Sequence, residues 1–221
     1  MKKATLHFNN IKLNPSQIHK FRGYVGNVFS EYDLIHNHDS VTGKHIYRYP
    51  LIQFKIIDKT PCIIALTKKA VQIFTEIFMN MDEMIIGGEK IPVQEKDLKI
   101  ETVEFGYSQE TFVYRFLSPW IALNQKNHHL YQHIETETEK KDMLKKILTG
   151  NILSMSKSLG LHLNIDQRIR VDHDLNSVKA FLKGKQMIGF KGIFKSNFQL
   201  PDGTGLGKSV SRGFGTIKRI L

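Results

Sequence analysis

Strand and helix patterns in the first part of the chain follow an order that few folds can accommodate. Alternating apolar residues predict strands at residues 6–8, 46–57 and 60–66, and two further strand segments at 84–86 and 90–93. Apolar residues at helical spacing predict helices at 14–29 and 68–79. The resulting order, β-α-β-β-α-β, is that of a ferredoxin-like unit.

The first predicted helix has a well-marked start. Asn14 suits the capping position, Pro15 suits the first turn, and Gln17 stands where a capping box needs it. A stripe of apolar residues at helical spacing is then expected to be buried; it comprises Ile18, Phe21, Val25, Val28 and Phe29.

A second unit of similar element order is expected from residue 97 onward. The predicted strands are at 98–106, 111–116, 168–172, 178–183, 187–198 and 214–220, and a helical stretch at 124–159 is broken around Glu135. Trp120 is expected to anchor the core. The sequence therefore predicts an α+β fold class with two tandem ferredoxin-like domains on antiparallel sheets, at residues 1–96 and 97–221.

A glycine-rich stretch near the C-terminus mixes small residues with cations. Five glycines fall within the thirteen residues from Gly203 to Gly215, and Lys208, Ser209 and Arg212 stand among them. Glycine lets a backbone turn through positive φ and approach a ligand closely. Exposed amides in such a turn form a concave anion site, which flanking cations reinforce. We expect a loop that clamps the phosphates of a nucleic acid, although a plain turn has a similar composition.

The same stretch does not fit a nucleotide-binding P-loop. Residues 207–209 match the second half of that motif, but Asp202 stands where its first glycine is required. A P-loop must also open a helix, whereas residues 214–220 are strand-like.

The charge of the chain favours a polyanionic partner. The formal net charge is +11, and the residues from Lys183 to the end include eight Lys or Arg but only one acid, Asp202.

The lone cysteine, Cys62, lies in an apolar run and is expected to be a small buried residue. Since the sequence shows neither an apolar signal segment nor a run long enough for a membrane span, we expect a cytoplasmic protein.

Two pairs among the ten histidines have a spacing that could carry chemistry. The first pair, His129 and His133, has the spacing of a zinc pair but lacks the Glu of the metalloprotease motif, so a solvated helix face is the simpler interpretation. His36 and His38 lie in a glycine-flanked loop. Two imidazoles beside a phosphate can deprotonate an attacking hydroxyl and protonate the leaving oxygen. RNA supplies that hydroxyl as its 2′-OH, so the pattern fits an RNA-cleaving site as well as two surface histidines.

The chain resembles one known family. Residues 21–27, 34–39 and 46–50 resemble its N-terminal signature, and residues 150–157 and 205–215 its C-terminal signature. The family is the CRISPR-associated endoribonuclease of the RAMP superfamily that cuts precursor CRISPR RNA inside each repeat, in its "b" subtype. The resemblance implies two tandem ferredoxin-like (RRM-like) domains with a glycine-rich loop near the C-terminus.

The resemblance also implies a chemistry and its residues. Cleavage is expected to need no metal or other cofactor and to leave a 5′-hydroxyl and a 2′,3′-cyclic phosphate. By resemblance His36 and His38 are the catalytic histidines, and Tyr47 is the best match for an assisting tyrosine, with Tyr49 a poorer second. Lys20, Arg22 and Lys44 are candidates for a catalytic cation. The expected RNA-binding residues are Arg22, Lys44, Gly205, Gly207, Lys208, Ser209, Arg212, Gly213 and Lys218.

Two other classes of protein are kept as alternatives. One is a non-catalytic subunit that binds CRISPR repeat RNA through the same basic loop. The other is a metal-dependent DNA nuclease of the HNH type, suggested by the string His36-Asn37-His38, although the next strand supplies Tyr47 and Tyr49 where acidic ligands are needed. Further partners left open are other proteins of a CRISPR effector complex and a second copy of the chain.

Overall fold

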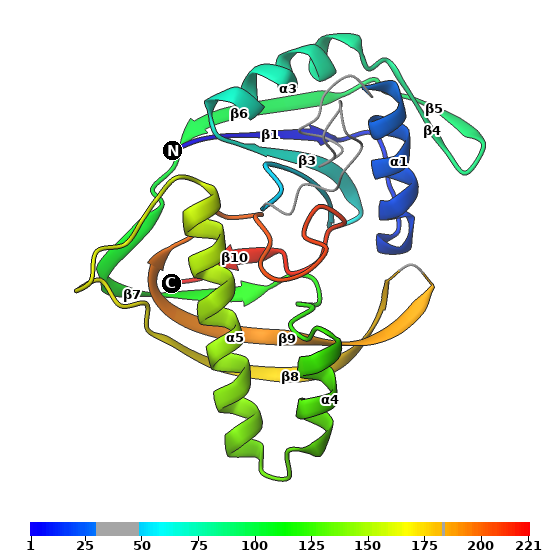
Figure 1. The fold of residues 1–221 in the computed structure, drawn as a ribbon. Coiled ribbons are helices and arrows are strands. Elements are labelled where there is room, and N and C mark those ends of the chain that lie inside the picture. Colours follow the sequence, from blue (N-terminus) through cyan, green and yellow to red (C-terminus); the bar gives the residue numbers. More distant parts are fainter. Residues whose placement is uncertain (30–48, 183) are drawn as a thin grey trace, which may run out of the picture. The chain divides into compact units, whose positions relative to one another are not determined.

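The computed structural model describes residues 1–29, 49–182 and 184–221, and the chain forms two compact units (Figure 1). The first unit comprises Met1–Val103 together with Val210–Gly213, and the second comprises Glu104–Ser209 together with Phe214–Leu221. Within the described residues, none of the helices has the length and apolar character needed to cross a membrane.

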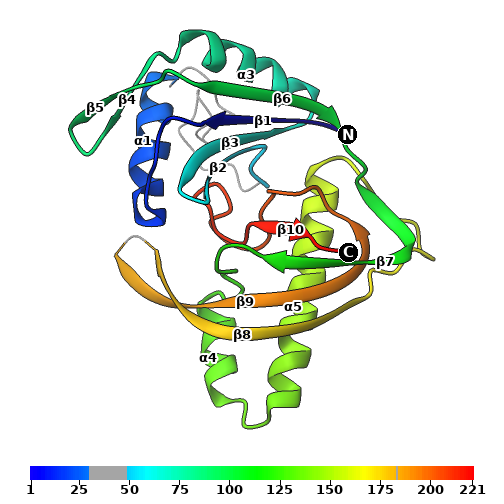
Figure 2. The ribbon, with the colours of Figure 1, turned by 180° about the vertical axis from the view of Figure 1, so that it is seen from behind.

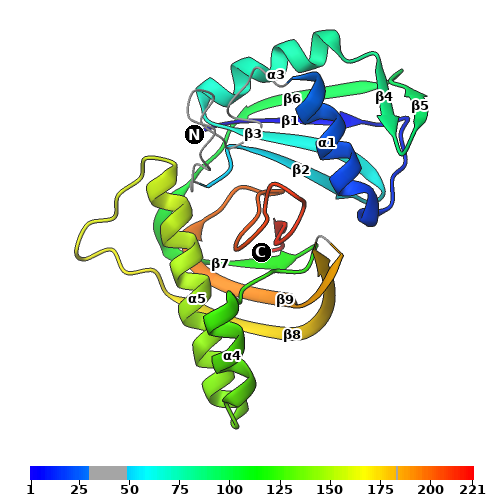
Figure 3. The ribbon, with the colours of Figure 1, turned by 45° about the vertical axis from the view of Figure 1, so that its right-hand side comes forward.

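A four-stranded antiparallel sheet forms the first unit. Its strands are β1 (Lys2–Phe8), β2 (Ile52–Ile57), β3 (Thr60–Leu66) and β6 (Lys96–Thr102), in the spatial order β2-β3-β1-β6. A short 3-10 turn, η1 (Pro15–Gln17), leads into α1 (Ile18–Val28), and α3 (Lys68–Asn80) follows β3. Figure 3 shows α1 and α3 on the same face of this sheet.

Aromatic residues join α1 to that sheet. The Phe21 ring of α1 makes edge-on contacts with Phe8 of β1 and Phe54 of β2, with centroids 5.8 Å and 5.5 Å apart. The predicted helix start is confirmed, because the capping box between Asn14 and Gln17 is present. Val28, expected in the buried stripe, is instead 47% exposed at the end of the helix.

The fourth strand of the first sheet was expected at 84–86 and 90–93, and this is wrong. Those segments form a separate hairpin of β4 (Glu83–Ile86) and β5 (Glu89–Pro92). The fourth strand is β6, which pairs with β1 along its whole length. The first unit therefore continues past the expected boundary at residue 96, because sheet membership is set by pairing with a strand far away in the sequence.

The second unit repeats the sheet of the first. Its elements are β7 (Gly106–Phe116), α4 (Gln125–His133), α5 (Glu137–Ser158), β8 (Val171–Leu182), β9 (Lys185–Gln199) and β10 (Ile217–Arg219). The antiparallel order β10-β7-β9-β8 places fourth, first, third and second strands side by side, as in the first sheet. The helices α4 and α5 lie on one face of it (Figure 2). Two tandem ferredoxin-like domains are thus confirmed.

A stacked aromatic core supports the second sheet. Trp120 is fully buried, as predicted, and its ring lies parallel to that of Phe116 with centroids 5.5 Å apart. The indole N–H of Trp120 donates to Oδ1 of Asn151 on α5, at 3.0 Å. Between β9 and β10, where the first unit has a helix between its third and fourth strands, residues 200–216 form turns and no helix.

Candidate functional site

The site predicted from the sequence falls partly outside the described residues. His36, His38, Lys44 and Tyr47 all lie in the undescribed segment 30–48. The described part of the predicted site consists of cations and glycines.

The glycine-rich segment, residues 200–216, is held by backbone hydrogen bonds, some within the segment and some to residues outside it. The amide of Leu206 donates to the carbonyl of Gly215 at 3.0 Å, and the amide of Lys208 donates to Ile121 at 3.1 Å. Gly207 has φ +86°, and a Cβ there would come within 2.5 Å of Nε1 of Trp120. Some of the amides expected to bind an anion are thus used inside the fold, and the side chains of the segment become the more important donors.

Four residues of this segment belong to the first unit. The Phe54 amide of β2 donates to the carbonyl of Ser211 at 3.4 Å, and Phe54 and Arg212 form a parallel bridge. The Gly213 amide closes a turn by donating to the carbonyl of Val210 at 3.2 Å. Gly213 has φ +83°, and a Cβ on it would lie 3.3 Å from Ile18 of α1. Residues 210–213, the edge turn, therefore extend the edge of the first sheet.

Lys55 of β2 lies beneath the edge turn. Its side chain is 1% exposed, and its Nζ donates to the carbonyl of Val210 at 3.1 Å. Burial lowers the pKa of Lys55 to about 7, and the neighbouring Cys62 opposes that shift. The sequence pattern does not single out Lys55, because Gln53 and Lys55 alternate with apolar residues as on a solvent-facing strand face.

Arg22 and Arg212 come together in the first unit. Both side chains are half-buried, one on α1 and the other on the edge turn. Burial, and after it the positive charge of Arg212, lower the pKa of Arg22 below its ordinary value. The Nε atom of Arg22 is buried and has no hydrogen-bond partner in the described part of the chain. Such an arrangement of like charges favours the binding of an anion.

The other predicted RNA-binding residues that the structure describes differ in their exposure. Lys208 of the second unit is exposed, and Ser209 beside it is half-buried with φ +57°. Lys218 is exposed on β10, while the guanidinium of its neighbour Arg219 lies 4.4 Å from the centre of the Phe112 ring. The amine of Lys20 lies close to Gly87 at the β4–β5 turn, whereas Arg22 is influenced by Arg212 of the edge turn.

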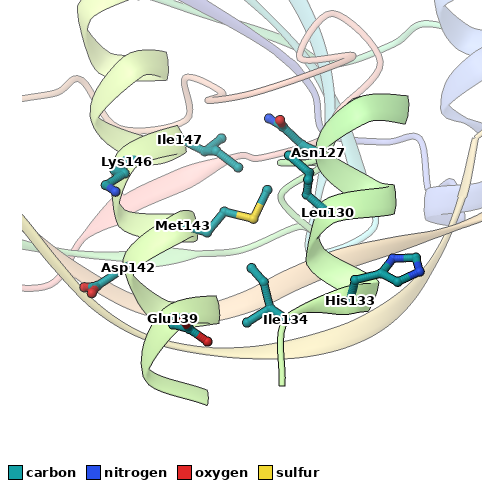
Figure 4. Close-up of a pocket in the computed structure, with 9 residues that line it drawn as sticks. All are labelled: Asn127, Leu130, His133, Ile134, Glu139, Asp142, Met143, Lys146 and Ile147. Atoms are coloured by element: carbon teal, nitrogen blue, oxygen red, sulfur yellow. The ribbon is translucent and has the colours of Figure 1, made fainter. Parts of the chain in front are cut away.

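A separate cleft of about 640 Å³ opens between α4 and α5 in the second unit. Figure 4 shows Leu130 and Ile134 of one side facing Met143 and Ile147 of the other. The lining is mainly apolar, with His133 at its margin. It has the character of a surface groove in a helical hairpin rather than of an anion site.

Both halves of the chain match known proteins. The family model of the Cas6b N-terminal domain matches residues 1–104, and that of the Cas6b C-terminal domain matches residues 106–220. A crystal structure of Cas6b matches with a TM-score of 0.91 at 35% identity. A crystal structure of the CRISPR RNA processing endoribonuclease Cas6b matches with a TM-score of 0.79 at 32% identity. Each of these two matches covers 100% of both chains.

A relative of known sequence covers part of the chain. It is the uncharacterized protein MJ0978 of Methanocaldococcus jannaschii, which is 40% identical over 148 residues. The matched residues are 66% of this chain and 97% of that protein.

Proposed function

Since this chain belongs to the Cas6b family, we propose that it is an endoribonuclease that cuts precursor CRISPR RNA within its repeats. The observation that carries the proposal is the agreement of the whole chain with Cas6b structures, one of them that of a CRISPR RNA processing endoribonuclease. The +11 net charge and the paired cations of the first unit support RNA as the partner.

The proposed reaction is an internal transesterification that uses no metal ion. The 2′-oxygen attacks the adjacent phosphorus, and the bond from phosphorus to the 5′-oxygen breaks. One of His36 and His38 removes the 2′ proton, and the other gives a proton to the leaving 5′-oxygen. The products are a 2′,3′-cyclic phosphate and a 5′-hydroxyl, and Tyr47 assists at the phosphate.

Positive charge is needed where the phosphate gains negative charge. A pentacoordinate phosphorane is stabilised by cations that are already in place before the reaction. Arg22 and Arg212 are suited to this, since they are close to one another and no carboxylate is paired with either in the described part of the chain. Lys208 and Lys218, both exposed, are proposed to bind phosphates farther along the RNA.

The first test compares two repeat RNAs in buffer containing EDTA. We expect the all-ribose RNA to be cut, and an RNA with one 2′-deoxyribose at the scissile nucleotide to be bound but left intact. Efficient cutting of the deoxy RNA would exclude attack by the 2′-hydroxyl. A requirement for magnesium would instead favour an HNH-type nuclease, and binding without any cutting would favour a non-catalytic RNA-binding subunit.

The second test removes the imidazoles one at a time. His36→Ala and His38→Ala are each expected to lower the single-turnover cleavage rate by about 10²–10⁴-fold, because each removes a proton-transfer group. RNA affinity should change little, as measured by filter binding. The control is His129→Ala, which removes an exposed histidine of α4; the proposal fails if this variant loses as much activity as the other two.

A further inference from the structure

Lys55 is placed where a lysine is costly to the fold. It is 1% exposed within β2, and its cross-strand neighbour is the fully buried Cys62. No ion pair of Lys55 with a carboxylate is found among the described residues. Removing an ammonium group from water without a counter-charge is unfavourable, whereas a methionine of similar length would fill the same space without that cost. Packing alone therefore does not explain a lysine here.

What lysine supplies and methionine lacks is a hydrogen-bond donor at the far end of the side chain. That donor reaches the carbonyl of Val210, a residue that is itself 2% exposed. The same carbonyl accepts the Gly213 amide that closes the edge turn. Lys55 thus holds the atom on which the conformation of the edge turn depends.

The edge turn is also attached to β2 through the parallel bridge between Phe54 and Arg212. Its backbone bond from the Phe54 amide to Ser211 is 3.4 Å long, at the weak end of the range for such bonds. Arg212 is the third residue of the turn, so the direction of its side chain follows from the way the turn is held. Fixing Val210 is therefore an effective way to fix Arg212.

The group that the charge of Arg212 acts on is Arg22, whose buried Nε has no hydrogen-bond partner among residues 1–29, 49–182 and 184–221. A buried N–H without an acceptor is costly, and a second guanidinium nearby adds repulsion. A phosphate group relieves both, since its oxygens accept bonds from two planar guanidinium groups at once. The pair is complementary to a phosphate before the ligand arrives.

We propose that Lys55 is a positioning residue: by holding the carbonyl of Val210 it fixes Arg212 beside Arg22, and the two guanidinium groups then clamp one phosphate of the bound RNA. This rests on the proposed function, which supplies RNA as the source of the phosphate. Lys55 itself does not touch the RNA.

The test measures how RNA affinity depends on salt. A repeat RNA with 2′-deoxyribose at the scissile nucleotide is titrated against Lys55→Met, Arg212→Ala, Arg22→Ala and their pairwise combinations at several salt concentrations. Loss of one phosphate contact lowers the slope of log K against log salt by about 0.7–0.9. Each single variant is expected to show the decrease in slope that corresponds to one phosphate contact. Each double variant is expected to show the same decrease and no more, because all three residues serve the same phosphate contact.

The matched control is Lys3→Met. Lys3 is a second buried lysine of the same sheet, 6% exposed, and its Nζ pairs with Glu101 at 3.2 Å. It should leave the salt slope as in the wild type. A general loss of stability would weaken binding in both lysine variants without changing the slope, so the slope separates positioning from stability.

Hydrogen–deuterium exchange of the RNA-free protein tests the role of Lys55 separately. Lys55→Met is expected to speed exchange in residues 210–213, and Lys3→Met is not. Unchanged exchange in residues 210–213 would overturn the positioning role of Lys55.

The shared phosphate is tested by the salt slope of the double variant Arg22→Ala/Arg212→Ala. A decrease in slope equal to the sum of the two single decreases would overturn the idea that both arginines bind one phosphate. These two variants alter half-buried surface residues, so they test the shared phosphate even if Lys55→Met does not fold. A wild-type protein that binds no repeat RNA would instead refute the proposed function, and the exchange result would still stand.

Discussion

At the scale of single residues, the most informative feature is a row of titratable groups across the first sheet. His7 of β1, Cys62 of β3 and Lys55 of β2 are direct cross-strand neighbours. Burial acts on all three, lowering the pKa of His7 and of Lys55 and raising that of Cys62 to about 12. Each group is therefore pushed towards its neutral form.

The pH dependence of stability should reveal Lys55. Its pKa is about 7 in the folded protein and 10.5 ordinarily, so between these values the unfolded chain binds more protons and stability rises with pH. We expect the free energy of unfolding, from urea titrations between pH 7 and about 8.5, to rise in the wild type and to rise less in Lys55→Met.

Two neighbours define that window. The Cys62 thiol keeps its proton in the folded state. Above its ordinary pKa of 9.0, Cys62 therefore makes the free energy of unfolding fall as pH rises, opposite to the contribution of Lys55. His7 acts below its ordinary value of 6.5. An equal rise in stability in wild type and variant across the window would show that Lys55 is charged and solvated in the fold.

The sequence predicted some single residues well and others not at all. Trp120 and Cys62 were predicted to be buried and are, because large or apolar residues in apolar runs have few alternatives. Lys55 was missed because strand alternation gives the face of a residue but not what covers that face. The pairing of Arg22 with Arg212 joins residues far apart in the chain, which no local pattern encodes.

At the scale of elements, local periodicity predicted the helices correctly, whereas the strand that completes the first sheet was predicted wrongly. The helices α1, α3, α4 and α5 lie in the stretches where the sequence predicts helices, since helical patterns are local signals. The fourth strand of the first sheet was misplaced, because β4, β5 and β6 are all short alternating segments. Only pairing with β1 distinguishes β6 from the other two.

The glycine-rich segment gives a prediction of its own. Gly207→Ala is expected to destabilise the protein by about 2–5 kcal/mol, since it combines an unfavourable positive φ with overpacking against Trp120. Gly150→Ala, at an exposed site of α5 with open space for a Cβ, should instead stabilise by about 0.5–1 kcal/mol. Thermal and urea unfolding of both variants measure the difference, and equal effects would contradict the described turn.

At the scale of the whole molecule, the chain does not divide into two continuous halves. Residues 210–213 belong to the first unit, although the residues on either side of them belong to the second. The family models, by contrast, divide the sequence once, between residues 104 and 106. A fragment that ends at Val103 therefore lacks part of its own unit.

Co-expressed fragments test this discontinuity. Residues 1–103 and 104–221 are expected to co-purify, because the second fragment carries the edge turn that completes the first unit. Lys55→Met in the first fragment should reduce recovery of the pair, through the loss of its bond to Val210. Fragments that separate fully and keep their individual folds would contradict the assignment of residues 210–213.

The buried, protonated state of the one cysteine in the chain has a practical consequence. Thiol-reactive dyes react with the thiolate form of cysteine. Cys62 is fully buried and its pKa is raised to about 12, so the native protein should not react with such dyes. A cysteine introduced by Gly23→Cys, on the open surface next to Arg22, would then be the single attachment point for a fluorophore. Such a probe would report the arrival of a ligand in real time, without any other change to the molecule.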